Sequence, residues 1–420
     1  MAKMELKKYK LGDCLTMIEN GAVIKQKKGA GGFPITRIET LSNDKFNRDR
    51  LGYADVCDEQ QYSHYILDDK DLLMSHINSR TFLGRTVIYR REKDETIIHG
   101  MNVLRLKVDE KHLNPMYAYY YFRTYNFKVG IDHIRKDAIN QSSLAISDIK
   151  NLDIYIPSIE TQNMIVSILG NIDLKIALNE KINQNLEALA KQLYDYWFVQ
   201  FDFPNEEGKP YKSSGGKMVW NDALKRHVPS IWSFKNLKDV ACFVKDKVET
   251  SKLNLNTYIS TENMQSNRGG ISIASNLPNT NYVTACNCGD IVIANIRPYF
   301  KKIFLIPTNG FGCSSDVLCI RSNDLMYSRF VYETLSDDAF FDYVMSGAKG
   351  SKMPRGDKEQ IMQYPVIVPN KELVEAFNCV VYPIHSQIHL YRKQAESLTK
   401  QRNELLPLLM NGQVSLLNCD

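Results

Sequence analysis

The chain has 420 residues, a length that predicts two or three domains with sizeable cores. Hydrophobic residues make up 44% and charged residues 24%, as in soluble globular proteins, and a net charge of +5 suits an anionic partner only if basic side chains gather on one face. No uncharged apolar run approaches a membrane span, the N-terminal residues MAKMELKKYK lack a signal-peptide core, and nine scattered cysteines favour a reduced interior, so we expect a cytoplasmic protein.

One pattern occurs twice along the chain, first at about residues 9–201 and again at about residues 237–413. The clearest stretch, 157–193, aligns without a gap with 369–405. Because the period is far longer than a solenoid unit, each copy is domain-sized, and we expect two halves related by a pseudo-twofold axis.

Each copy begins with a pattern of short strands followed by a helix. The first copy predicts strands at 35–41 (ITRIETL), 71–80 (DLLMSHINSR, a strand running into a loop) and 101–106 (MNVLRL), and a helix at 115–125. The second predicts their counterparts at 258–264, 290–299, 315–320 and 326–335. This mixture indicates α+β or mixed α/β domains. The tyrosines at 117, 119, 120, 121 and 125 could stack on bases, but helical spacing favours a packing role.

The second part of each copy predicts long helices with heptad patterns. In the first copy, one set of seam positions starts at Ile165. A second set is expected at Ile168, Lys175, Ile182, Leu189 and Tyr196. Each helical part is expected to bend, at 170–171 and at 382–383, and the two long pieces to pack as an antiparallel coiled coil. The predicted helix-pair interface consists of Ile172, Ile182, Leu186, Leu189, Leu193, Ile384, Ile388, Tyr391, Leu398 and Leu405.

Asn179 occupies a seam position, and two interpretations are open. Solvent exposure of that part of the helix is favoured over a buried amide that sets the register. The predicted boundaries are a first globular domain at 1–155, a first helical region at 156–203, a linker at 204–230, a second globular domain at 231–368 and a second helical region at 369–420.

Motifs for chemistry are few. No phosphate-binding loop, dinucleotide fingerprint or amino-methyltransferase motif is present, so no catalytic residue is predicted. Cys286, Cys288, Cys313 and Cys319 could in principle bind zinc, but the first copy has no equivalent thiolates, and no metal site is expected. The residues favour a binding protein.

Basic and polar residues recur in corresponding loops of the two copies, a pattern that points to nucleic acid. The predicted DNA-binding residues of the first copy are Lys25, Lys27, Lys28, Arg37, Asn78, Ser79, Arg80, Arg85, Lys136, Gln141 and Ser142. Those of the second copy are Lys245, Lys247, Ser260, Asn267, Arg268, Arg297, Tyr299, Lys301, Lys302, Lys349, Ser351, Lys352 and Arg355.

Five segments carry a resemblance that covers nearly the whole chain: IPSIETQNMIVSIL (156–169), LEALAKQLYDYWFVQFDFP (186–204), YISTENM, GDIVIANIRPY and LLPLLMNGQV (405–414). With the tandem order, the chain resembles the specificity (S) subunit of type I restriction–modification systems. The resemblance implies two target-recognition domains that each read half of a split DNA site, and helical regions that dock modification subunits, two in number, and restriction subunits. It also implies that S-adenosylmethionine, ATP and Mg act in the partner subunits.

Two other classes of function stay open. One is a stand-alone methyltransferase or nuclease with divergent motifs, and the other is a coiled-coil scaffold that does not bind DNA. The target sequence cannot be read from the chain, because base preference depends on loop geometry.

Overall fold

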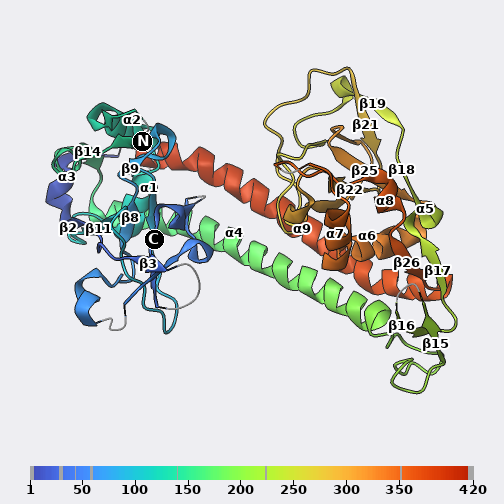
Figure 1. Cartoon of the computed structure of the whole chain (residues 1–420). Coiled ribbons are helices and arrows are strands. Elements are labelled where there is room, and N and C mark those ends of the chain that lie inside the picture. Colours follow the sequence, from blue (N-terminus) through green and yellow to red (C-terminus); the bar gives the residue numbers. More distant parts are fainter. Residues whose placement is uncertain are drawn as a thin grey trace, which may run out of the picture. The chain divides into compact units, whose positions relative to one another are not determined.

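The computed structural model describes residues 4–27, 32–42, 44–56, 60–139, 141–222, 225–350 and 352–414. The chain divides into two compact units. Unit 1 comprises residues 1–178 and 394–420, and unit 2 comprises residues 179–393. Each unit therefore contains a globular domain and one part of each of the two long helices, α4 (Ile159–Tyr194) and α9 (Lys371–Met410) (Figure 1, green and red).

A four-stranded antiparallel sheet forms the centre of each globular domain, and its strand order is the same in both. In unit 1 the order is β10 (Thr86–Ile88), β8 (Leu72–Met74), β11 (Leu104–Val108) and β2 (Leu15–Asn20). In unit 2 it is β23 (Ile303–Leu305), β22 (Ile291–Ala294), β25 (Val317–Ser322) and β18 (Ala241–Phe243). The internal repeat predicted from the sequence is confirmed by this shared strand order, and the predicted class, α+β or mixed α/β, is confirmed as well.

The central strands are buried on both faces, which explains their continuous apolar sequences. Leu72 and Met74 of β8 belong to a core cluster with helix α1 (Pro115–Tyr121), whereas Leu73 faces a second cluster with Val87 and Val103. β22 alternates in the same way. Its Ile291 and Ile293 face α6 (Ser328–Ser336) and α7 (Asp338–Ser346), and Val292 and Ala294 face the opposite side.

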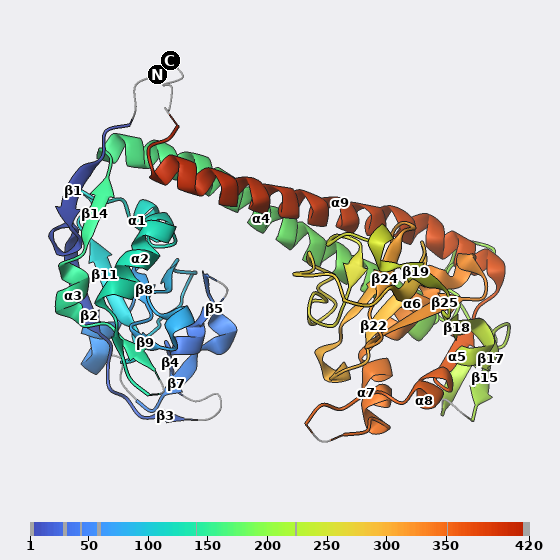
Figure 2. The same ribbon diagram turned by 90° about the horizontal axis from the view of Figure 1, so that it is seen from above.

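A two-stranded antiparallel ribbon leads into each long helix. In unit 1, β1 (Lys7–Lys10) pairs with β14 (Asp153–Ile156), and α4 begins at Ile159 (Figure 2). In unit 2, β17 (Ser233–Asn236) pairs with β26 (Pro365–Val368), and α9 begins at Lys371. The ribbon closes each domain by joining its first strand to its last.

The tyrosine run packs in the core. Tyr117 and Tyr120 are fully buried and Tyr119 and Tyr121 nearly so, in the cluster that also holds the sheet. Tyr125, at the start of α2 (Tyr125–Ile134), is 80% exposed and is the exception.

Both long helices are continuous, so the predicted bends at 170–171 and 382–383 are wrong. Pro383 removes one backbone donor from α9, but the helical run continues on both sides of it. Within each unit the helix parts pack antiparallel. In unit 1, Arg402 forms an ion pair with Asp173 at 2.7 Å while Leu409 packs near Ile165; in unit 2, Arg392 pairs with Glu187 at 2.6 Å.

The expected second set of seam positions on α4 is displaced by one residue. Leu169, Ile176 and Ala190 are buried, whereas Lys175 is exposed and Leu189 is 49% exposed, so Leu189 was wrongly predicted as an interface residue. Residues at i+3 and i+4 lie on the same helix face. The direction in which α9 crosses α4 decides which of them is covered. The remaining predicted seam residues are half-buried, apart from the buried Ile388.

Asn179 is only 4% exposed, so the expectation that it lies in solvent is wrong. Its role in setting the register stays a prediction. The segment 204–230 is also more ordered than a simple linker, since it forms a hairpin of β15 (Met218–Asn221) and β16 (Arg226–Pro229) that buries Val228. No helix in the described ranges combines the length and apolar character of a membrane span.

Candidate nucleic-acid interface

Three loops that lie far apart in the sequence meet in unit 2. The backbone N–H groups of Asn267 and Arg268 donate to the carbonyls of Phe300 and Lys301, at 2.8 and 2.9 Å. Arg297 N–H donates to the carbonyl of Pro354 at 2.8 Å. The structure thus brings together three groups of predicted DNA-binding residues, at 267–268, 297–302 and 349–355.

Unit 1 has the same arrangement around the loop that follows β8. A small sheet runs in the order β12 (Lys136–Asp137), β13 (Ser142–Ser143) and β9 (Ile77–Asn78). In unit 2, single bridges join Lys349 to Arg355 and Arg355 to Ile296 in the corresponding order. In each unit, the loop that follows the central strand, β8 or β22, therefore pairs with a hairpin that precedes the long helix.

Arg297 is the basic residue of this cluster that is best placed to contact a ligand. Its backbone is left-handed, with φ +52°, and Pro298 follows it at the start of a 3-10 turn, η8 (Pro298–Phe300). Its Nε is buried and has no hydrogen-bond partner among the described residues. A strained backbone held by Pro354 and a side-chain donor without an acceptor are typical of a functional position.

Other predicted cations of unit 2 already have partners within the chain. Lys301, at 2.8 Å, and Arg268 both bind the carboxylate of Asp338, and these hydrogen bonds lower the pKa of Asp338 to about 2. Lys302 donates to the carbonyl of Thr261 at 2.6 Å, and burial lowers the pKa of Lys302. These contacts shape the loops, so Arg268, Lys301 and Lys302 are less available for DNA than Arg297.

The exposed residues of the hairpin are better placed to contact DNA than Arg268, Lys301 and Lys302. Lys349 and Arg355 have side chains that are 83% and 57% exposed, although Lys349 pairs with Asp357 and Arg355 with Asp316. Lys352 is exposed, and Tyr299 is 46% exposed and packs against the Phe300 ring at 4.6 Å. Exposed pairs of this kind exchange readily with phosphate, because solvent-screened ion pairs are weak.

In unit 1, the predicted residues Arg80 and Lys136 are 66% and 68% exposed, with Asp132 and Asp148 at 3.6 and 3.3 Å. Asn78 donates to the Ser75 hydroxyl, while the buried Ser142 hydroxyl donates to Asp137 at 2.6 Å. Arg85 stacks over Phe82 at 4.4 Å and is largely covered.

The remaining predicted residues are scattered. Lys25, Arg37, Ser79, Gln141, Lys245 and Lys247 are exposed, and Ser260 is half-buried. Lys27 belongs to β3 (Gln26–Lys27), and Lys28 and Ser351 lie outside the described residues. No contact of the described residues joins Lys245 or Lys247 to the three loops.

Two exposed apolar side chains at corresponding hairpin tips were missed by the sequence analysis. Ile139 is fully exposed between β12 and β13, and Met353 is 51% exposed between Lys349 and Arg355. In the sequence, these two residues could have been singled out because each is an apolar residue inside a polar loop. Apolar side chains can contact the thymine methyl group or wedge between base steps.

Three of the four possible zinc ligands lie in mutual contact, but the fourth does not join them. Cys286, Cys313 and Cys319 belong to one buried cluster of unit 2, whereas Cys288 is exposed and its thiol faces the carbonyl of Pro307 at 3.3 Å. Across the part of the chain that the structure describes, no group of three or more histidine, cysteine or acidic side chains is arranged to hold a metal ion.

Comparison with known proteins points to one family. A family model described as the type I restriction modification DNA specificity domain matches residues 3–188. A putative type I restriction enzyme MjaX specificity subunit of Methanocaldococcus jannaschii is 28% identical over 96% of this chain and 92% of its own length. Residues 3–188 therefore match the type I restriction specificity-domain family, and the chain as a whole is similar to type I restriction specificity subunits.

Other specificity subunits agree with this assignment. The HindI specificity subunit of Haemophilus influenzae is 22% identical over 64% of this chain and 71% of its own length. The crystal structure of an S subunit from M. genitalium superposes with a TM-score of 0.59 at 16% identity and covers 97% of this chain and 96% of that one. That structure supports the fold.

Proposed function

We propose that this specificity subunit reads a split double-stranded DNA site, with one recognition domain for each half-site. The observation that supports this proposal most directly is the recurrence, in both units, of a strand-end loop joined to a hairpin with exposed Arg or Lys residues. Arginine can bind guanine bidentately in the major groove, and flanking lysines bind phosphates. Because the two loops differ in sequence, the two domains then read different half-site sequences.

The long helices are proposed to dock the modification subunits, two in number, and through them the restriction subunits. Exposed apolar residues support this role, since such side chains outside the core often mark interaction surfaces. Leu174 and Leu178 of α4 are 68% and 55% exposed one turn apart in unit 1, and Leu189 and Leu390 are exposed in unit 2.

The subunit itself is proposed to be non-catalytic and to act in the cytoplasm. S-adenosylmethionine, ATP and Mg then serve the partner subunits, which carry out adenine methylation and cleavage. The sequence supports this division because it contains no phosphate-binding loop, dinucleotide fingerprint or amino-methyltransferase motif.

The test is methylome sequencing of cells that carry the complete operon. We expect N6-methyladenine at a two-part motif with an unread gap. In Arg297→Ala, one half of the motif should become degenerate, with about 1–3 kcal/mol of discrimination lost, while the other half stays unchanged. Arg80→Ala should relax the opposite half if Arg80 reads a base.

Lys209→Ala provides a control, since Lys209 is an exposed lysine of the hairpin segment and Glu207 is its one ion-pair partner among the described residues. It should leave the motif unchanged. If Arg297→Ala weakens methylation equally at all sites, Arg297 contacts phosphate and not a base. The catalytic alternative is tested with the purified chain alone, in the presence of S-adenosylmethionine or Mg²⁺; DNA methylation or cleavage there would contradict the proposed non-catalytic role.

A further inference from the structure

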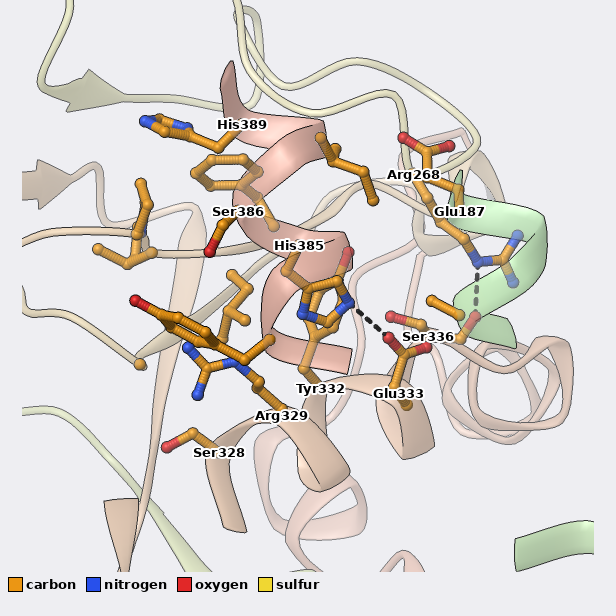
Figure 3. A pocket seen from close by; sticks show the side chains of 18 of the residues that line it. Glu187, Arg268, Ser328, Arg329, Tyr332, Glu333, Ser336, His385, Ser386 and His389 are labelled. Carbon is orange, nitrogen blue, oxygen red and sulfur yellow. Dashed lines mark hydrogen bonds and ion pairs between the residues drawn. The ribbon is translucent and has the colours of Figure 1, made fainter. Parts of the chain in front are cut away.

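Unit 2 contains a cavity of about 590 Å³ that the proposed DNA-reading function does not use (Figure 3). This volume is within the usual range for small-molecule sites. Its walls come from α6, from the parts of α4 and α9 that belong to unit 2, and from the segment after β23. The apolar part includes the buried residues Phe304, Ile306 and Ile388.

Most charged groups that line the cavity are neutralised by another residue of the chain. Glu187 binds Arg392 at 2.6 Å, and Glu333 binds His385 Nε2 at 2.9 Å. Lys191 lies 3.1 Å from Asp337. Arg268 is held by Asp338, outside the lining, and donates from Nε to the carbonyl of Ser336 at 2.6 Å. These contacts leave little net charge on the walls.

Arg329 differs from these groups. Its Nε is buried and has no hydrogen-bond partner among the described residues, and no carboxylate there forms an ion pair with it. Its guanidinium lies 4.4 Å from the centre of the Tyr382 ring, and burial lowers its pKa. An arginine remains charged at neutral pH even so, and a buried guanidinium N–H without an acceptor is costly, although the residue as a whole is only half-buried. Figure 3 places Arg329 on the α6 wall, opposite His385, Ser386 and His389 of α9.

One more unsatisfied polar atom lines the same cavity. His385 Nδ1 is buried and has no partner in the described part of the chain, whereas the Ser336 hydroxyl lies within reach of Tyr332. An apolar chamber with one guanidinium that lacks an acceptor and one unsatisfied ring nitrogen fits a ligand that is mainly apolar but carries a single anionic group.

We propose that this cavity binds a small amphipathic carboxylate, whose carboxylate pairs with Arg329 and whose apolar body packs against Phe304, Ile306 and Ile388. The planar guanidinium can bind a carboxylate through two parallel hydrogen bonds. The ligand would contact the recognition domain and both helix parts of unit 2 at once, and would therefore stabilise their packing in the bound state.

The test uses the full-length subunit and two matched probes, naphthalene-2-carboxylate and the neutral naphthalene-2-carboxamide. Isothermal titration calorimetry should show the carboxylate binding about tenfold or more tightly than the amide, because a charge-assisted pair is stronger than a neutral hydrogen bond. Arg329→Met should abolish this preference, and Arg329→Lys should restore part of it. Arg355→Gln, which removes an exposed arginine outside the cavity, should leave it unchanged.

A thermal melt of each variant without probe checks the fold. Arg329→Met should melt at or above the wild-type temperature, because it removes an uncompensated charge. The proposal is overturned if the wild type binds neither probe at about 1 mM, if both probes bind equally, or if Arg329→Met retains the preference. A large loss of stability in Arg329→Met would also contradict it, since that result would reveal a structural partner for the guanidinium.

Discussion

Replacing Arg105 by methionine should destabilise the sheet of unit 1 strongly. Arg105 and Asp71 have side chains only 2% and 3% exposed, and Nε lies 2.7 Å from the Asp71 carboxylate. Arg105 also donates to Asp68 at 3.1 Å and to the carbonyl of His64 at 3.0 Å. After substitution, Asp71 would keep the hydrogen bond from the Asp68 N–H at 2.7 Å but would be a buried charge without its cation.

Breaking a buried pair in this way costs about 3–5 kcal/mol. Hydrogen-exchange mass spectrometry is the suitable assay because it reports local stability. Amides of β8 and β11 should exchange roughly 10²- to 10⁴-fold faster in Arg105→Met, if local opening governs exchange. Amides of β22 and β25 in unit 2 provide an internal control and should be unaffected.

The loss should also depend on pH. Burial raises the pKa of Asp71 above its ordinary value, against the opposing effects of the Asp68 N–H and Arg105. A carboxyl whose folded pKa is raised costs stability once the pH exceeds that pKa, and this cost disappears as the pH falls towards the unfolded value. Removing the Arg105 cation should raise the folded pKa further, so acidification from neutral pH should reduce the difference between variant and wild type.

The matched control is Arg91→Met. Arg91 is 43% exposed and lies 3.4 Å from Asp68, so its loss should cost less than about 1 kcal/mol. If Arg105→Met behaves like Arg91→Met, or if its defect grows on acidification, then the Arg105 cation does not stabilise the buried Asp71 carboxylate.

Four further predictions concern the helices and the loops. Phe377→Ala removes a fully buried ring that packs on Phe198 at 4.9 Å and should lower the unfolding free energy of unit 2 by about 3–5 kcal/mol, measured by tryptophan fluorescence in urea. Asn183→Leu should stabilise the protein by about 1 kcal/mol in the same assay, because the buried Oδ1 of Asn183 has no partner among the described residues. Met353→Ser and Ile139→Ser should each weaken binding by about 1–2 kcal/mol at one half-site, with no change in melting temperature; equal loss on unrelated DNA would argue against base contact. Inserting one heptad into each long helix should lengthen the preferred unread gap by about three base pairs, since seven residues add roughly 10 Å, and selection of the original spacing would contradict a spacing role.

The sequence was sufficient for features that depend on neighbours along the chain. The duplication, the buried strands at 71–76 and 290–294, and the seam from Ile165 to Leu193 could be read from local spacing alone, because side-chain direction repeats with a period of 2 in strands and 3.6 in helices. The predicted bends failed for a related reason. A proline or glycine lowers local helix propensity, but packing of Phe377 and Val381 against the core keeps α9 continuous.

Only the tertiary structure decided which basic residues have partners and where a cavity forms. Sequence identified Arg268, Arg297 and Lys301 as equivalent candidates, but Asp338 holds two of them and leaves Arg297 without an acceptor among the described residues. The cavity likewise needs α4, α6 and α9, and the lining residues of α4 lie more than a hundred positions before those of α6 and α9. Such contacts depend on the angle at which packed elements cross, and local spacing along the sequence does not specify that angle. The sequence alone therefore determined the family resemblance and the repeat. The packing determined which side chains lack a partner within the described part of the chain and can contact a ligand.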